Sequence, residues 1–212
     1  VASAVHVWDA TTVNNGSYTA YIDGIAANGG SNIIPHMQSF FVSTTAAATL
    51  TFQDDDRVTD PDIEGTLYRS TKDTIIRLQL AGQGFEIESV IRFKNGSTSG
   101  YDLNLDALLL SKGNTSGIDF SSVSEDKKNL VINSLPPENM NVTLPLMSST
   151  GTNGTYSIEM TQFDNLSSNF LVVLNDLQEG TTHILNDGPY NFIGGVNDDI
   201  NRFELQTTTS IA

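Results

Sequence analysis

The chain contains no cysteine. Disulfide bonds, thiolate zinc sites and thiol nucleophiles are therefore all excluded. The absence does not fix the cellular compartment, because a secreted protein does not require disulfides.

Basic residues are scarce as well. The chain has 10 Lys and Arg against 25 Asp and Glu, which gives a net charge of -15, and Lys127-Lys128 is its one adjacent basic pair. Nucleic acids and anionic lipids are bound by clustered Lys and Arg. We therefore expect no nucleic-acid partner. No apolar stretch reaches the length of a membrane-spanning helix, so we also expect no membrane insertion.

What the sequence does contain indicates an all-β protein. Short segments that alternate apolar and polar residues are separated by turn-forming strings such as NNGS, KNGSTSG and SSTGTNGT. The strands predicted from this pattern follow an N-terminal strand in VHVW and span Ser17–Ile22, Ser39–Val42, Thr49–Phe52, Thr74–Leu80, Glu86–Phe93, Leu130–Asn133, Val142–Leu146, Tyr156–Met160, Phe170–Leu174 and Arg202–Leu205. Strands at this spacing are typical of an antiparallel β-sandwich or jelly roll.

An acidic segment divides the pattern. Between Asp54 and Gly65 charge rises, apolar residues become rare and Pro61 interrupts any strand. The sequence therefore predicts a partial β segment over residues 1–65, packed on the next domain or left from an upstream sandwich, and a complete β-sandwich over residues 66–212.

Six pieces of the chain carry a resemblance to a known family. They are IIPHMQSFFV at Ile33–Val42, IRFKNGSTSGYDLNLDALLL at Ile91–Leu110, NLVINSLP at Asn129–Pro136, TLPL with GTYSIEM within Thr143–Met160, LNDLQEGTTHIL at Leu174–Leu185 and NRFEL at Asn201–Leu205. In this order they resemble the β-sandwich region that precedes the sorting domain in proteins exported by the type IX secretion system of Bacteroidetes. The chain departs from that family at Leu108, where the family usually has Lys.

The resemblance implies a location and a role. It suggests a secreted, cell-surface protein whose sorting domain would be removed after Ala212 during export. The leading function is then a non-catalytic structural or adhesive module, whose partners are other domains of the same polypeptide or neighbouring surface subunits. The alternative is a carbohydrate-binding module of a secreted polysaccharide-degrading enzyme, with glycans as partners.

Carboxylates offer one candidate metal site. Asp54, Asp56, Asp60 and Asp62 provide the oxygen ligands that calcium prefers, although the segment lacks the spacing of an EF-hand. A solvated acidic linker is the alternative. The acidic loop Asn197–Asn201 is a second candidate of the same kind. Calcium is the only cofactor that the sequence suggests.

Catalytic groupings are weak in this sequence. Glu86 and Glu88 share one face of a strand, as a glycosidase pair could, but the alternation of that strand places both toward solvent. Asp102 and Asp106 are interpreted as structural groups that bind loop backbone. His6, His36 and His183 show no metal-binding spacing. We therefore predict that the chain is not an enzyme.

Two further candidates concern carbohydrate. Trp8 and Tyr18 lie on the first strands and could stack on sugar rings, with ordinary core packing as the alternative. Asp73-Thr74-Ile75 resembles the O-glycosylation motif of Bacteroidetes, which would place a sugar on Thr74.

Overall fold

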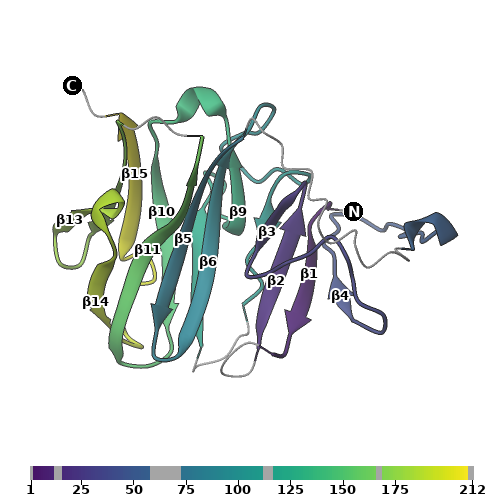
Figure 1. Ribbon diagram of the computed structural model, residues 1–212, viewed down its shortest axis with the longest axis horizontal. Coiled ribbons are helices and arrows are strands. Elements are labelled where there is room, and N and C mark those ends of the chain that lie inside the picture. Colours follow the sequence, from purple (N-terminus) through teal and green to yellow (C-terminus); the bar gives the residue numbers. More distant parts are fainter. Residues whose placement is uncertain (1, 12–15, 58–72, 112–116, 166–168, 210–212) are drawn as a thin grey trace.

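The N-terminal strands form a small sheet of their own. The computed structural model describes residues 2–11, 16–57, 73–111, 117–165 and 169–209. The small sheet is antiparallel, has the order β3-β2-β1-β4, and is built from β1 (Val5–Asp9), β2 (Ser17–Ile22), β3 (Ile25–Ala27) and β4 (Phe40–Phe41). Figure 1 shows it beside the larger body that the later strands form.

The later strands form one large mixed sheet. Its order is β13-β12-β15-β10-β8-β9-β6-β5-β11-β14, with β7 paired to β9. All its pairs are antiparallel except β6 with β9, which are parallel. The strands are β5 (Thr74–Gly82), β6 (Phe85–Phe93), β7 (Ala107–Leu108), β8 (Ile118–Val123), β9 (Asn129–Leu135), β10 (Thr143–Thr150), β11 (Gly154–Asp164), β12 (Phe170–Asp176), β13 (Thr181–Ile184), β14 (Tyr190–Gly194) and β15 (Phe203–Thr209).

The large sheet folds over on itself and encloses the main core. Leu78 on β5 and Leu205 on β15 belong to the same buried cluster, although these strands lie far apart in the sheet order. In Figure 1, β5, β6 and β11 run in front of β10 and β15. The all-β, sandwich-like prediction is confirmed.

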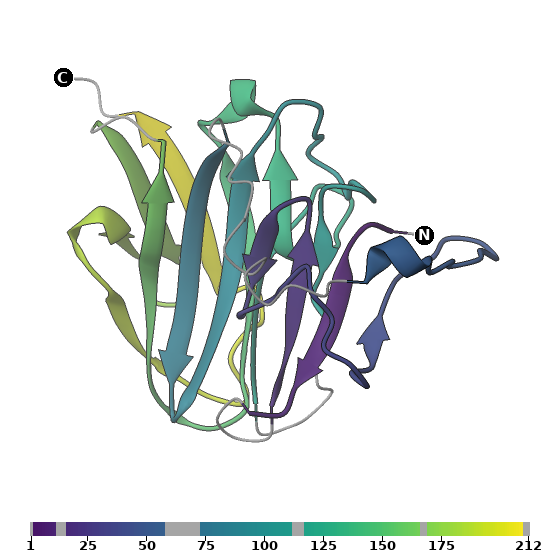
Figure 2. The ribbon, with the colours of Figure 1, turned by 45° about the vertical axis from the view of Figure 1, so that its right-hand side comes forward.

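A second apolar cluster joins the small sheet to the sandwich. Ala20, Ile22 and Ala27 from the small sheet pack with Val90 and Ile132 on the outer face of the large sheet. Figure 2 brings this third layer forward. The small sheet thus covers a face of β6 and β9 that would otherwise be open to solvent.

Some strand predictions differ from the structure. Residues Thr49–Phe52 form no strand, and the segment predicted at Ser39–Val42 contains only the two-residue β4. β8 was not predicted. The boundary predicted at residue 65 lies outside the described residues, so the domain division stays a prediction. Among the described residues, no helix is long and apolar enough to cross a membrane.

Candidate functional site

The predicted calcium residues are only partly described. Asp54 and Asp56 lie in the short 3-10 helix η1 (Asp54–Asp56) and are exposed, and Asp56 accepts a hydrogen bond of 2.7 Å from the amide of Gln53. Asp60 and Asp62 lie outside the described residues. Within the described residues, no group of three His, Asp or Glu side chains is placed to hold a metal ion. Calcium binding at the full set therefore stays a prediction.

The second acidic loop is occupied by internal contacts. Asp198 accepts a hydrogen bond of 3.0 Å from Arg202 Nη1 and another from the amide of Gly195. Asp199 accepts the amide of Asn201 at 2.9 Å. These bonds fix the loop before β15, so its carboxylates serve the fold.

Thr74 begins β5 and is buried. The residue is 8% exposed, and its hydroxyl donates to the carbonyl of Asn165 at 3.3 Å. A sugar on this oxygen would replace the hydroxyl proton and need space that the fold fills. The folded arrangement therefore counts against glycosylation of Thr74, which stays untested.

Trp8 and Tyr18 are cross-strand neighbours. They face each other in the β1–β2 register, with ring centroids 4.9 Å apart, and Phe41 contacts Tyr18 at 5.6 Å. Directly opposed residues of an antiparallel pair share one face. The same face carries Ala20, which packs on the large sheet. The aromatic cluster of Trp8, Tyr18 and Phe41 therefore continues the inner face of the small sheet.

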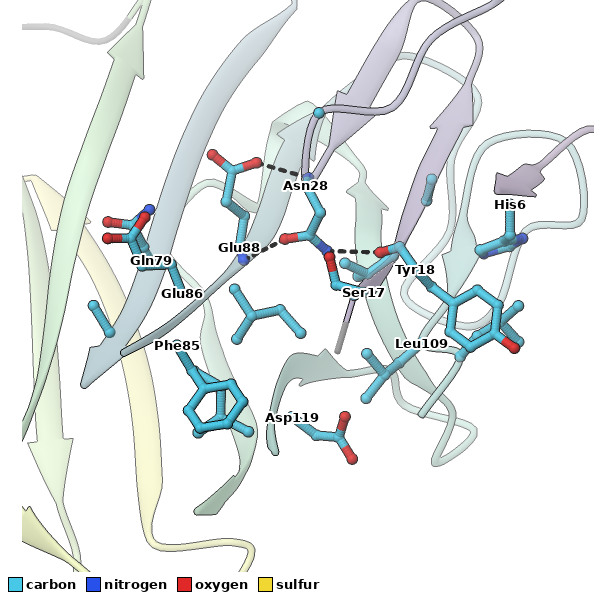
Figure 3. Close-up of a pocket in the computed structure, with 18 of the residues that line it drawn as sticks. His6, Ser17, Tyr18, Asn28, Gln79, Phe85, Glu86, Glu88, Leu109 and Asp119 are labelled. Carbon is cyan, nitrogen blue, oxygen red and sulfur yellow. Dashed lines mark hydrogen bonds between the residues drawn. The ribbon is translucent and has the colours of Figure 1, made fainter. Parts of the chain in front are cut away.

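A pocket opens where this inner face meets the large sheet. It has a volume of about 600 Å³, within the usual range for small-molecule sites. Tyr18 contributes from the small sheet and Phe85, Glu86 and Glu88 from β6, while Asp119 comes from β8. In Figure 3, Glu86 and Tyr18 lie on opposite sides of the pocket, with Asp119 below them. We call this space the interlayer pocket.

The length of β3 explains the pocket. The last β2–β3 pair is Ala20 with Ala27, so the first residues of β2, including Tyr18, have no β3 partner. Beyond Asn28 the chain leaves the sheet, and nothing from β3 continues over the Glu86 end of β6. A layer that covers β6 only partly leaves an opening at its edge.

Glu88 is held by a network that fastens β3 to the large sheet. The backbone amide of Asn28 donates to Glu88 Oε2 at 2.8 Å, and the backbone amide of Glu88 donates to Asn28 Oδ1 at 2.7 Å. Arg77 forms an ion pair of 3.0 Å with Glu88 and also donates to the carbonyl of Ala26. Glu88 is thus a structural group. The prediction that it faces solvent is wrong, because the small sheet covers that part of β6.

Glu86 has a different environment. It is exposed at the mouth of the pocket, as its strand position predicted, and its side chain forms no hydrogen bond or ion pair with the described residues. Gln79, on the neighbouring strand β5, also lines the pocket. The sequence did not single out Gln79, although a polar residue at an outward position of an aliphatic strand was the signal available.

His6 lines the pocket and carries no charge. Its Nε2 lies 2.8 Å from the carbonyl of Leu108. Burial lowers the pKa of His6 and outweighs the opposing effect of this hydrogen bond. Neutral His6 therefore anchors β1 to β7, and it lies apart from His183, whose Nε2 is 3.0 Å from the carbonyl of Gly188.

A buried arginine lies at the other end of the contact between the small sheet and β6. Arg92 on β6 is fully buried and pairs with Asp23 at 3.1 Å, and Asp73 lies 3.8 Å away. Lys94 bridges the same two carboxylates at 3.1 and 3.3 Å. Arg92 also donates to Ser134 on β9. No sequence pattern indicated this network, which joins the β2–β3 turn to the sandwich.

Asp102 and Asp106 have the structural role predicted for them. Asp106 accepts the amide of Ser134 at 2.6 Å and the amide of Asp102 at 2.7 Å, while Asp102 accepts the amide of Thr98. Burial raises the pKa of Asp106 to about 7, against the effect of these hydrogen bonds. Both carboxylates hold loop backbone, as expected.

The Asp and Arg of the last two motif pieces meet in a second buried pair. Arg202 Nη2 lies 2.7 Å from Asp176 Oδ2, and the two side chains are 2% and 1% exposed. Arg202 also lies over the rings of Phe192 and Phe203, at 4.9 and 5.1 Å from their centroids. Asp176 ends β12, as predicted, and Tyr190 donates to it at 3.0 Å. These motif residues therefore build the scaffold.

Comparison with known proteins adds one family. A family described as a domain of unknown function, DUF8693, matches residues 2–206. No curated protein and no solved structure matches the chain. The match extends over nearly the whole chain and includes both sheets, so the chain belongs to the DUF8693 family.

Proposed function

We propose that this chain is a non-catalytic structural module of a secreted, cell-surface protein, which holds functional regions apart or packs against neighbouring subunits. One observation carries the proposal: three acidic or basic residues of its motifs, Asp106, Asp176 and Arg202, are committed to internal contacts. Asp176 and Arg202 bind each other, and Asp106 binds backbone amides. Such residues rigidify a scaffold, and their charged groups are engaged within the fold. The surface location is proposed from the type IX resemblance alone.

The location is tested on intact cells of the native organism. The full-length protein is tagged next to this module, labelled with antibody before and after permeabilisation, and exposed to an external protease. Surface labelling and loss of the tag to protease are expected. A signal that appears only after permeabilisation would refute the proposal.

The spacer role is tested by replacement. Residues 2–206 are exchanged in the full-length protein for an unrelated β-sandwich of similar length. A structural spacer predicts that export and the activity of the neighbouring domains persist. Loss of activity in the exchanged protein, with export and folding intact, would show that the module makes specific contacts.

A second function has support from the aromatic cluster. Tyr18 lines the interlayer pocket with Trp8 packed against its edge, so a ring is available where a sugar could stack. A glycan array should then show binding that Tyr18→Ala removes. Tyr21→Ala is the matched control, since Tyr21 is the same residue type on the opposite face of β2. Binding that survives Tyr18→Ala, or no binding at all, would count against this function.

A further inference from the structure

The interlayer pocket has an uneven charge balance. Three carboxylates line it, those of Glu86, Glu88 and Asp119, and no Lys or Arg is among the described residues of its wall. His6 is neutral, as argued above. A ligand in this pocket therefore meets negative charge on several sides.

Among the residues that the structure describes, a counter-ion is present for one of the three carboxylates. Glu88 is paired with Arg77 at 3.0 Å. Asp119 accepts a hydrogen bond of 2.5 Å from the hydroxyl of Ser111, which carries no charge. Within the described part of the chain, neither Glu86 nor Asp119 lies in an ion pair. Two negative charges thus have no counter-ion among the described residues around a space of about 600 Å³.

The rest of the wall is apolar and aromatic. Tyr18 and Phe85 provide rings, and Ile87, Leu109 and Ile118 provide aliphatic surface. Aromatic faces attract organic cations as well as aliphatic chains. A wall of this kind suits the methylene stem of a ligand whose charged end reaches a carboxylate.

The net charge of the whole molecule also favours a positively charged ligand. Its net charge of -15 attracts cations and repels anions over a distance set by ionic strength. A neutral ligand would gain nothing from this field and would have to satisfy the carboxylates of Glu86 and Asp119 through hydroxyl groups alone. Charge therefore favours a cationic ligand over an anionic or neutral one.

We propose that the interlayer pocket binds an organic cation, a primary ammonium or guanidinium group on an apolar stem such as a Lys or Arg side chain. Glu86 and Asp119 supply the charge partners, while Tyr18 and Phe85 contact the stem. The proposal goes beyond the structural role given above and does not depend on it, because a pocket on a spacer can bind a partner's basic side chain.

The experiment is calorimetric titration of the folded chain with four probes. They are the capped amides of lysine and arginine, the capped amide of norleucine as a neutral analogue of similar length, and a neutral oligosaccharide. Lysine or arginine amide is expected to bind about tenfold more tightly than norleucine amide, as two partly exposed charge contacts allow. The difference in affinity between the charged amides and norleucine amide should shrink when the ionic strength rises from about 0.01 to about 1 M, because the screening length decreases.

Two variants locate the binding. Glu86→Gln and Asp119→Asn should each weaken cation binding about fivefold, the upper range for an exposed ion pair, while binding of norleucine amide stays the same. Asp187→Asn is the matched control: it removes the same charge from an exposed residue of η4 (Leu185–Asp187), outside the pocket. Equal melting temperatures would show that all three variants fold.

Several results would overturn the proposal. Equal affinity for lysine and norleucine amides would remove the role of charge, and an equal effect of Asp187→Asn would reduce it to the general field. Binding of the oligosaccharide without binding of the cations would refute it in favour of the glycan function. No binding by any probe would also refute it, while leaving the surface-module proposal untouched.

Discussion

Replacing Asp176 by Asn should destabilise the protein strongly. The substitution keeps the shape of the side chain but removes the charge that compensates buried Arg202, whose side chain is 2% exposed. Removal of one partner of a buried ion pair costs about 3–5 kcal/mol, because the other charge remains desolvated. For a domain of this size, each kcal/mol lowers the melting temperature by about 2–4 °C. We therefore expect a fall of roughly 10 °C.

The assay is urea unfolding followed by circular dichroism, with thermal melting as a second readout. Asp198→Asn is the matched control, since Asp198 also pairs with Arg202 at 3.0 Å but its side chain is 27% exposed. Partly exposed pairs contribute about 1 kcal/mol or less. Equal losses for the two variants, or a loss below about 1 kcal/mol for Asp176→Asn, would refute the assignment of a buried ion pair.

A double variant and a pH series sharpen this test. Asp176→Leu with Arg202→Met removes both charges and keeps apolar contact with Phe192, so it should recover much of the stability lost by Asp176→Asn. Burial acts to raise the pKa of Asp176, but hydrogen bonds from Arg202 and its neighbours outweigh burial and hold that pKa below its ordinary value. Its stabilisation is therefore present above about pH 4 and is lost as pH falls further. The gap between wild type and Asp176→Asn should narrow in acid.

Three other positions give distinct predictions. The pKa of Asp106 is raised to about 7. The stabilisation by protonated Asp106 is therefore present below about pH 4 and is lost as pH rises toward 7, at up to about 1.4 kcal/mol per pH unit. Asp106→Asn should remove this pH dependence of stability from urea titrations, and an unchanged pH dependence would contradict the prediction. The hydroxyl of Ser89 is buried without a hydrogen-bond partner among the described residues, so Ser89→Ala should leave stability unchanged or raise it by about 1 kcal/mol; a clear loss in urea unfolding would show that the hydroxyl is satisfied. A Cβ on Gly30 would lie 2.1 Å from the carbonyl oxygen of Ala20, so Gly30→Ala should cost about 1–3 kcal/mol, whereas a neutral result in thermal melting would show that the turn after β3 can move.

Local alternation was enough to predict the faces of the long strands. On β5, Ile76, Leu78 and Leu80 point into the main core, as their spacing of two requires. The turn between β5 and β6 was not predicted; Gln83 and Gly84 both have positive φ there, as a two-residue hairpin of this type needs. The strand predicted at Thr49–Phe52 is wrong, because this segment pairs with no strand among the described residues in spite of its strand propensity.

The candidate site could not be assembled from the sequence. Tyr18 and Glu86 were each singled out, but nothing in the local pattern brings residues 68 positions apart to one pocket. Alternation showed correctly that Glu86 and Glu88 lie opposite the core, yet it could not show that a second sheet covers one of them. Which layer covers a strand depends on long-range packing, and the periodicity of a single strand carries no information about it.

The outward face of β6 explains both the stability of the layer contact and the position of the pocket. Along this face, Arg92 is closed in by Asp23, Val90 packs in the second apolar cluster, and Glu88 is tied to the end of β3. Each contact lies nearer the end of β3 than the last, and Glu86 lies beyond it, where its side chain has no charged or hydrogen-bonding partner among the described residues. The same alternation that supplies an anchor at every second residue therefore leaves one unpaired carboxylate where the covering strand stops. Because β3 has only three residues, the layer that covers β6 ends before Glu86 and leaves this carboxylate at the mouth of the pocket.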